Sequence, residues 1–416
     1  MVLCFKPYEF SKSLGFGFII TKLKISIKQQ LLNPIILTLR KLIFKQHFAV
    51  VGVSPTTNQT INQMNIEKID IELLSRLTNA AGAPGYEDRI REQIQKEIKD
   101  YVDEMSVDNL GNLIALKKGT ASDSNTKKVM VDAHMDEIAF MVTHIDDNGF
   151  IRFHPLGGFD PKTLTAQRVI IHGKKDMLGV LGTKAIHMMT AEERKKTAEL
   201  DDYFVDLGLP KEEVEKFVSI GDTITRERDL VEIGNTISTK SLDNRIAVYI
   251  LVETLKNLEA TPFDVYAVFS VQEEVGLRGA LVAARNIDPD FAICLDTTVT
   301  NDMPSVSPQK RVTELGKGTG IKIIDSQTIC DPRMVDFLKA TADRESLKWQ
   351  PEVLPAGGTN TASLQRGGSG SIAGAISIPT RYLHQVTEMV HKDDVLASTR
   401  LLMAALETMD KYNWDR

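Results

Sequence analysis

Cysteine is scarce in this chain of 416 residues, which contains only Cys4, Cys294 and Cys330. Three widely spaced cysteines can build neither a disulfide framework nor a Cys-x-x-Cys zinc site. A reducing compartment therefore fits the sequence best, and we expect the protein to be cytoplasmic. Cys294 lies within an apolar run, where we expect it to be a small buried core residue.

Excess positive charge is also missing, since the net charge is −6 and the sequence pI is about 5.8. This balance argues against nucleic acid as the main partner. In residues 1–63, lysines interrupt every apolar run before it reaches the ~20 residues of a membrane-crossing helix. We therefore expect neither a nucleic-acid partner nor a membrane partner. With 42% hydrophobic and 25% charged residues, the chain is typical of a globular protein of about two domains.

The first 63 residues differ from the rest in charge. They contain eight lysines and arginines but a single acid, Glu9, so they carry +7 and the remainder carries −13. We interpret residues 1–63 as a doubtful basic N-terminal extension and expect the true start at Met64. A basic targeting or membrane-surface segment and a genuine structural extension remain open alternatives.

After Met64, the apolar pattern predicts an α/β domain interrupted by a β-rich insertion. Residues 64–139 form its first part, residues 140–237 the insertion and residues 238–416 its second part. The near-continuous apolar strands predict a sheet covered by helices on both faces. We expect strands at 128–134, 263–271, 291–295 and 374–378, and helices at 65–74, 86–104, 245–258, 280–286, 332–344 and 395–409.

Five short motifs carry the candidate chemistry, and four of them follow predicted strands. Because ligand sites of open α/β sheets gather at the carboxyl ends of strands, we expect these motifs to converge. Each motif alone is common in structural roles, but the set is not. The motifs are Ala133-His134-Met135-Asp136-Glu137, Ser241-Leu242-Asp243-Asn244-Arg245, Gln272-Glu273-Glu274-Val275-Gly276, Cys294-Leu295-Asp296-Thr297 and Arg381-Tyr382-Leu383-His384.

Two imidazoles and three carboxylates from these motifs can hold a pair of divalent cations, with one carboxylate bridging them. The set would accept Zn, Co or Mn. Glu273 and Glu274 are adjacent, so both can serve one site only where the strand breaks, and we expect Gly276 and Gly279 to supply that break. One glutamate would bind metal and the other would take a proton from water.

His134 and Asp136 lie two residues apart, which places them on one side of an extended chain. We expect Asp136 to orient the site, either by accepting the second ring N–H of His134 or by holding a neighbouring backbone segment. Asp243 precedes a predicted helix, from where its carboxylate can reach the same crevice.

As a set, these motifs resemble the M42 family of metallo-aminopeptidases, which includes glutamyl aminopeptidase and the tetrahedral (TET) aminopeptidases. The resemblance covers about residues 66–412. It implies a di-zinc exopeptidase fold, with a mixed sheet flanked by helices, and two divalent ions per subunit, Zn or Co. It also implies that His134 and Asp296 hold one ion, that Glu274 and His384 hold the other, that Asp243 bridges them, and that Glu273 is the general base on the bridging water.

The resemblance further implies that the insertion is a small β-barrel, PDZ-like dimerisation domain. Substrates would be peptides with a free N-terminus, and the protein would be a dimer-based homo-oligomer, with the dodecamer common in the family. The chain departs from the family where Gly358-Thr359-Asn360 replaces Gly-Gly-Thr-Asp, which removes a carboxylate near the site. The tail Gln385-Val386-Thr387-Glu388-Met389 and the segment 182–194 are also less typical.

Three alternatives to an aminopeptidase remain open. The first is another two-metal amide hydrolase, such as a deacylase or a carboxypeptidase. The second is a glycosidase that uses two carboxylates and needs no metal, because some relatives are labelled endoglucanases. The third is a non-catalytic metal-dependent scaffold. The sequence does not identify the preferred N-terminal residue.

Overall fold

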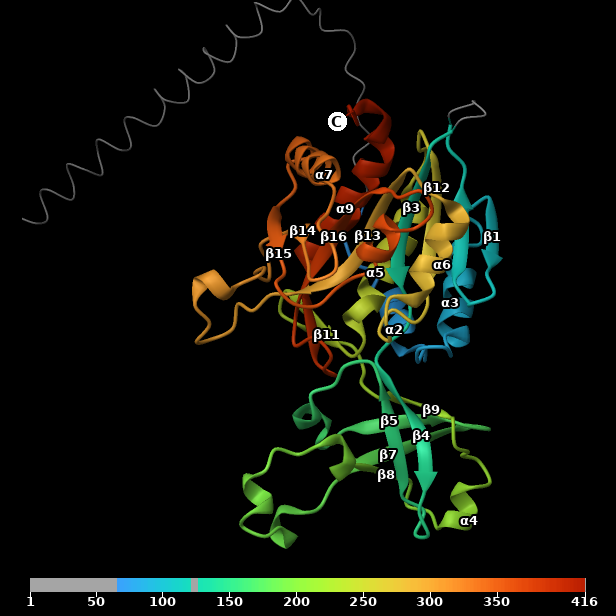
Figure 1. The fold of residues 1–416 in the computed structure, drawn as a ribbon, viewed down its shortest axis with the longest axis vertical. Helices are drawn as coiled ribbons and strands as arrows, with labels where there is room; N and C mark the ends of the chain where they lie inside the picture. The colour runs from blue at the N-terminus through green and yellow to red at the C-terminus, as the bar shows by residue number, and fades with distance from the viewer. Residues whose placement is uncertain (1–65, 121–125, 416) are drawn as a thin grey trace, which may run out of the picture. The chain divides into compact units, whose positions relative to one another are not determined.

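The structure is a computed structural model that describes residues 66–120 and 126–415. The doubtful extension 1–63 and the expected start at Met64 lie outside the described residues. The described chain forms one large sheet flanked by helices and one separate closed barrel (Figure 1). The predicted fold class, an α/β fold with a mixed sheet and an inserted small barrel, is therefore confirmed.

The large sheet has 11 strands among the described residues. Its four central strands run parallel to one another, and antiparallel neighbours on both sides make the sheet mixed. In order across the sheet, the strands are β1 (Glu104–Val107), β2 (Leu113–Lys117), β12 (Asp264–Ser270), β3 (Lys128–His134), β13 (Phe291–Val299), β16 (Ile372–Arg381), β17 (Glu388–His391), β11 (Thr236–Thr239) and β10 (Val231–Ile233), with β14 (Thr319–Ile324) and β15 (Trp349–Val353) joined at β16.

Both faces of the central strands are buried, as their apolar runs predict. Successive side chains of β3 alternate between two cores: Val129 and Val131 belong to the larger core, and Met130 belongs to the smaller one. The larger core includes side chains of α5 and α9, and the smaller one includes side chains of α6 and α8. The helices are α2 (Ile71–Asn79), α3 (Asp88–Ile98), α4 (Lys211–Val214), α5 (Leu242–Asn257), α6 (Arg278–Ile287), α7 (Pro332–Arg344), α8 (Thr361–Gln365) and α9 (Lys392–Thr408).

The barrel has a core of its own, which includes Phe140, Ile171 and Ile224. Alternate positions along its short strands point inward, so a modest number of apolar residues fills it. In order around the barrel, the strands are β4 (Ala139–Ile145), β5 (Ile151–Leu156), β8 (Phe204–Asp206), β7 (Asp176–Gly182), β6 (Arg168–His172) and β9 (Thr223–Arg226). The exact domain boundaries at 140 and 237 stay a prediction.

Two predicted helices near the start of the domain differ from the observed ones. The helix expected at 65–74 begins at Ile71, where the Asp70 side chain accepts a hydrogen bond from the backbone of Leu73 and caps the first turn. The helix expected at 86–104 ends at Ile98, and Tyr101 is 43% exposed instead of packed. The prediction failed there because a chance match extended the apolar period beyond the true end of the helix.

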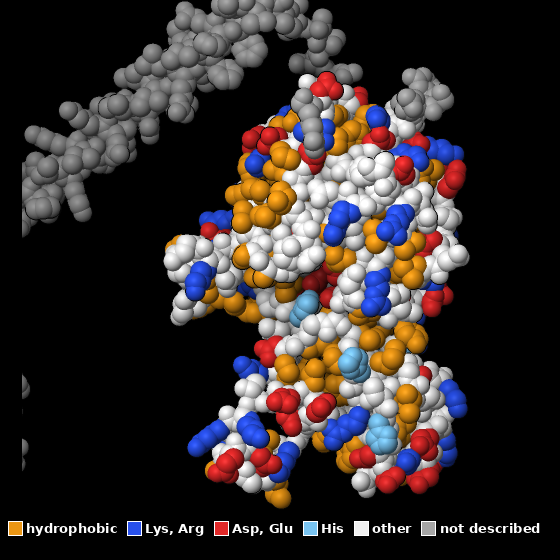
Figure 2. Space-filling view, viewed as in Figure 1, with side chains coloured by type: hydrophobic (Ala, Val, Ile, Leu, Met, Phe, Trp, Pro, Cys, Tyr) orange, Lys and Arg blue, Asp and Glu red, His pale blue; other side chains and the backbone are white. Residues whose placement is uncertain are grey.

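Charged side chains of both signs are interspersed on the face shown in Figure 2. Among the described residues, no helix is long and apolar enough to cross a membrane.

Candidate metal centre

The parallel strands bring the predicted site residues together. His134 is the last residue of β3, and Glu273 and Glu274 follow the end of β12. Asp296 lies on β13, which was predicted to end at Leu295 but continues to Val299. His384 follows β16 after a short link. Because these strands share one direction, their carboxyl ends meet at one edge of the sheet.

Asp243 lies in an irregular first turn of α5. The helix starts at Leu242, but Asp243 and Asn244 have non-helical backbone angles, and the peptide bond between them is cis. The Asn244 side-chain amide donates a hydrogen bond of 2.9 Å to the carbonyl of Leu295 on β13. Asp243 was expected to precede the helix, and its observed place inside the first turn still directs the carboxylate into the site.

The first group of ligating atoms surrounds His134. Its Nε2 atom lies 3.4 Å from Oδ1 of Asp243 and 3.8 Å from Oδ1 of Asp296, while Oε2 of Glu273 lies 3.9 Å away. His134 is almost completely buried, as are the carboxylates of Glu273 and Asp296. Such a group of close oxygen and nitrogen atoms could hold a metal ion.

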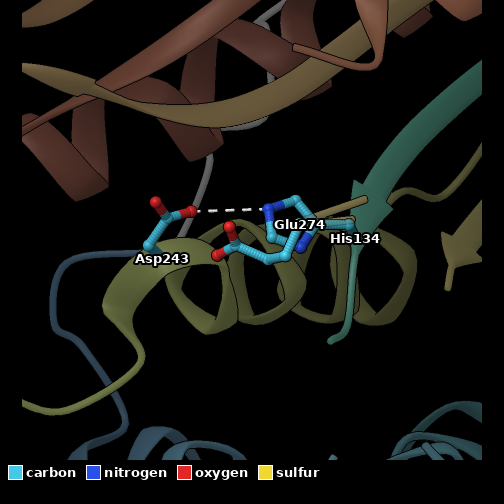
Figure 3. Close-up of side chains that lie close together, drawn as sticks. All are labelled: His134, Asp243 and Glu274. Atoms are coloured by element: carbon cyan, nitrogen blue, oxygen red, sulfur yellow. Dashed lines mark ion pairs between the residues drawn. The ribbon is translucent and has the colours of Figure 1, made fainter. Parts of the chain in front are cut away.

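The second group lies on the other side of Asp243. Nε2 of His384 is 3.5 Å from Oδ2 of Asp243 and 3.6 Å from Oε2 of Glu274. The two oxygens of Asp243 therefore face different histidines, which is the arrangement that a bridging carboxylate needs. His134 at the end of β3, Asp243 in α5 and Glu274 in the turn after β12 point toward one another (Figure 3).

The break before the two glutamates is not where we predicted it. Strand β12 ends at Ser270, and the chain turns at Gln272, a non-glycine residue with φ of 56°. Gly276, with φ of 127°, comes only after both glutamates. The expectation that Gly276 and Gly279 supply the break was wrong in position, because sequence rules find left-handed backbone mainly through glycine.

Asp136 holds the backbone of both glutamates. Its two carboxylate oxygens accept hydrogen bonds of 3.0 Å and 3.1 Å from the backbone N–H groups of Glu273 and Glu274. Nδ1 of His134 lies 3.3 Å from Asp136 but makes no hydrogen bond of good geometry. We expected Asp136 either to accept a hydrogen bond from His134 or to hold a neighbouring backbone segment, and the structure shows the second of these contacts.

The electrostatics of the site favour bound cations. Burial raises the pKa of Glu274 to about 8 and that of Asp296 to about 7, and neighbouring carboxylates contribute to both shifts. Burial alone would lower the pKa of His384, but Asp243 and Glu274 raise it to about 10. Because Oε1 of Glu274 also lacks a hydrogen-bond partner among the described residues, the residues present fit a pair of divalent ions.

Glu388 has a role that was not predicted from the sequence. Its two carboxylate oxygens accept hydrogen bonds from the backbone N–H groups of His384, at 2.8 Å, and Asp243, at 2.9 Å. The side chain is 1% exposed and holds the backbone of two ligand candidates at once. The signal was the tail 385–389, which we noted only as a departure from the family.

A second buried carboxylate, Glu137, ties two of the motifs together. Lys240 donates a hydrogen bond of 2.7 Å to Glu137, and Ser241 donates another. Arg245 lies 3.6 Å from the same carboxylate and donates a hydrogen bond to the carbonyl of Met135. This network fixes the chain just after His134 and on both sides of Asp243 without reaching the ligating atoms.

Two further motif residues also have structural surroundings. Arg381 pairs with both carboxylate oxygens of Asp302, at 2.7 Å each, and so anchors the segment before His384. The Asn360 amide, buried outside the pocket lining, donates hydrogen bonds of 2.8 Å to Asp132 and 3.0 Å to Ser270. Position 360, where the family usually has Asp, therefore holds an amide in this chain, and the carboxylate of Asp132 lies in contact with that amide.

The ligand candidates line a pocket of about 910 Å³. Gly158, Phe159 and Asp160, which follow barrel strand β5, form one wall of it. The Gly158 carbonyl lies 2.8 Å from Nδ1 of His384, so the ring can donate a hydrogen bond there and direct Nε2 toward Asp243. The site therefore uses residues from both the large sheet and the barrel segment.

These features match one known family. The sequence profile of the M42 glutamyl aminopeptidases matches residues 111–401. The chain therefore belongs to the M42 family and is a hydrolase that acts on peptide bonds. Membership of this metallopeptidase family implies use of divalent metal, in agreement with the donor set above.

Individual relatives are similar over nearly their whole length. A candidate aminopeptidase from Acetivibrio thermocellus is 42% identical over 336 residues, which cover 80% of this chain and 98% of the relative. The structure of an aminopeptidase from Desulfurococcus kamchatkensis superposes with a TM-score of 0.77 at 36% identity, over 81% of this chain and 94% of that one. The TET1 peptidase of Pyrococcus horikoshii, which can assemble into a tetrahedron or an octahedral shell, has a TM-score of 0.72 at 32% identity, over 81% of this chain and 98% of that one.

Proposed function

We propose that the protein is a two-metal aminopeptidase that removes N-terminal residues from peptides. One divalent ion, Zn or Co, would be held by His134, Asp243 and Asp296, and the other by Asp243, Glu274 and His384. The observation that carries this proposal is the carboxylate of Asp243, whose two oxygens face the two histidines at 3.4 Å and 3.5 Å.

Bound divalent ions would polarise the scissile carbonyl and make the attacking water more acidic. Glu273 is the proposed general base that takes the proton from this water and later delivers it to the leaving amine. Burial raises the pKa of the Glu273 carboxyl well above its usual range, with Asp296 and Glu274 adding to the shift. Asp136 is the proposed positioning residue, because it holds the backbone N–H of Glu273.

The experiment that tests the proposal compares initial rates on free and N-acetylated forms of the same peptides, with the full-length protein. Each reaction is repeated after chelation and after restoration with Zn²⁺ or Co²⁺. We expect cleavage of the free-amine peptides only, lost on chelation and regained with metal. Cleavage that ignores the N-terminus would indicate another amide hydrolase, hydrolysis of glycans despite chelation would indicate a glycosidase, and bound metal without turnover of any peptide would indicate a scaffold.

We further propose that the enzyme is a cytoplasmic homo-oligomer assembled through the barrel. Exposed apolar side chains on and beside barrel strand β7 support this assembly: Leu178, Val180, Ile186 and Met188 are each more than half exposed. The assembly of the related TET1 peptidase supports a homo-oligomer. The buried free thiols of Cys294 and Cys330 support a reducing compartment such as the cytoplasm. Light scattering should give the wild type a molar mass that is a multiple of the chain mass, and Leu178→Asp should lower this molar mass. A monomeric wild type would contradict the proposal.

A further inference from the structure

The pocket beside the metal centre has a largely apolar wall away from the ligating side chains. This wall is built from segments that are distant in sequence but meet around the same cavity. Apolar surface of this kind stabilises a bound aliphatic or aromatic side chain by removing it from water. The apolar side chains are Phe159, Leu277, Val299, Leu354 and Leu383.

The charges of the wall are as informative as its apolar residues. Among the described residues that line the pocket there is no lysine or arginine, and Asp160 is the one carboxylate outside the candidate ligands and Glu273. Asp160 is exposed and accepts a hydrogen bond of 3.1 Å from the backbone of Lys162, but no ion pair joins it to a cation among the described residues. The free charge of the wall is therefore negative.

The arginines adjacent in sequence or space to this pocket are engaged elsewhere. Arg226 is 2% exposed, and its Nη1 donates to the carbonyl of His384 behind the pocket. Arg278 donates to the Gln272 side chain, and Arg381 is held by the bidentate pair with Asp302. None of the three lines the cavity, so the described pocket offers no cation to an acidic substrate side chain.

We infer that this aminopeptidase site accepts apolar N-terminal residues and discriminates against acidic ones. The inference rests on the proposed function and specifies its substrate class. Burial of a Leu-sized side chain raises kcat/KM by roughly 10- to 100-fold. A Glu carboxylate in the same place would lose its hydration without gaining an ionic partner. It would also be repelled by the like charge of Asp160, and both effects oppose binding. The glutamyl specificity in the family's description therefore does not extend to this chain.

The test measures kcat/KM of the full-length metal-loaded protein on Leu, Lys and Glu 4-nitroanilides at one pH and ionic strength. We expect the Glu substrate to be the slowest of the three, with the Leu substrate exceeding it about 100-fold, and the Lys substrate to be tolerated because the free charge of the wall is negative. Hydrolysis of the Glu substrate as fast as the Leu substrate would overturn the inference while leaving the aminopeptidase function intact. Failure to cleave any of the three, or any free-amine peptide, would refute the function as well.

A charge variant tests the cause of the selectivity. Gln327 lines the pocket, is exposed and makes no side-chain hydrogen bond among the described residues. Gln327→Arg should raise the Glu-to-Leu ratio of kcat/KM at least about fivefold, because it supplies a cation to the wall. Gln95→Arg, with the same change in charge on helix α3 outside the pocket, should leave the ratio unchanged. Leu354→Arg is the second pocket variant, and unchanged ratios in both pocket variants would contradict the inference.

Discussion

Substitution of Glu388 by glutamine should destabilise the protein and weaken its metal centre together. Glu388 accepts hydrogen bonds from the backbone N–H groups of Asp243 and His384 while almost fully buried. Glutamine keeps the shape but replaces one acceptor oxygen by a donor, which must then face one of the two N–H groups. The variant loses one charge-assisted hydrogen bond and leaves buried donors unsatisfied, for a combined cost of about 2–4 kcal/mol.

Burial and the Asp243 carboxylate raise the pKa of Glu388 to about 8, so urea denaturation of the metal-free protein at about pH 9, where Glu388 is ionised, measures this cost as a fall in the free energy of unfolding. Because both affected N–H groups belong to ligand candidates, titration with Zn²⁺ should also show affinity at least about tenfold weaker. Glu253→Gln is the matched control, since the Glu253 side chain is partly buried and, among the described residues, forms an ion pair only with Lys256; it should cost within about 0.5 kcal/mol. A Glu388→Gln variant as stable as the control, with unchanged metal affinity, would refute the reasoning.

The remaining predictions concern three other carboxylates. Arg381 outweighs burial and lowers the pKa of Asp302 from 3.8 to about 2, so Asp302→Asn should lower the free energy of unfolding by about 2 kcal/mol at pH 7. That contribution is fully present above about pH 4 and is lost as pH falls toward 2. Urea titrations across this range should therefore show the free energy of unfolding of the wild type approaching that of the variant. A difference between the two proteins that is independent of pH would contradict the pairing. Asn360→Asp places a second buried carboxyl against Asp132 and should lower the free energy of unfolding by about 2–4 kcal/mol in the same assay. Adding Asp132→Asn should restore most of this loss. A double variant no more stable than the single one would be evidence against this exchange. Asp243→Ala should remove both metal ions, as measured by elemental analysis, and retention of two ions would exclude a bridging role.

Much of the fold followed from local patterns in the sequence. Helix α7 has the predicted bounds, 332–344, because Asp331 caps its first turn and Pro332 follows in a favoured position. The convergence of His134 and Asp296 followed from a single rule about the carboxyl ends of parallel strands. The metal-ligating and catalytic roles assigned to these residues stay predictions, but their proximity is now a feature of the structure.

The missing parts of the prediction depend on contacts between distant residues. Glu388 and Asp243 are 145 positions apart, so local sequence patterns do not predict that the Glu388 carboxylate holds the backbone of Asp243. Gln272 has left-handed backbone angles without being glycine, which tertiary contacts must stabilise at a cost of about 1–3 kcal/mol. The loss of a carboxylate at Asn360 could be interpreted only after Asp132 was found against it.

The most direct test of the central claim compares wild type and Glu273→Gln at equal metal content. Elemental analysis first establishes two divalent ions per chain in both proteins, and kcat is then measured on a free-amine peptide. The account predicts that Glu273→Gln retains both ions and loses at least about 100-fold in kcat. Near wild-type turnover with both ions bound would remove Glu273 from the role of general base.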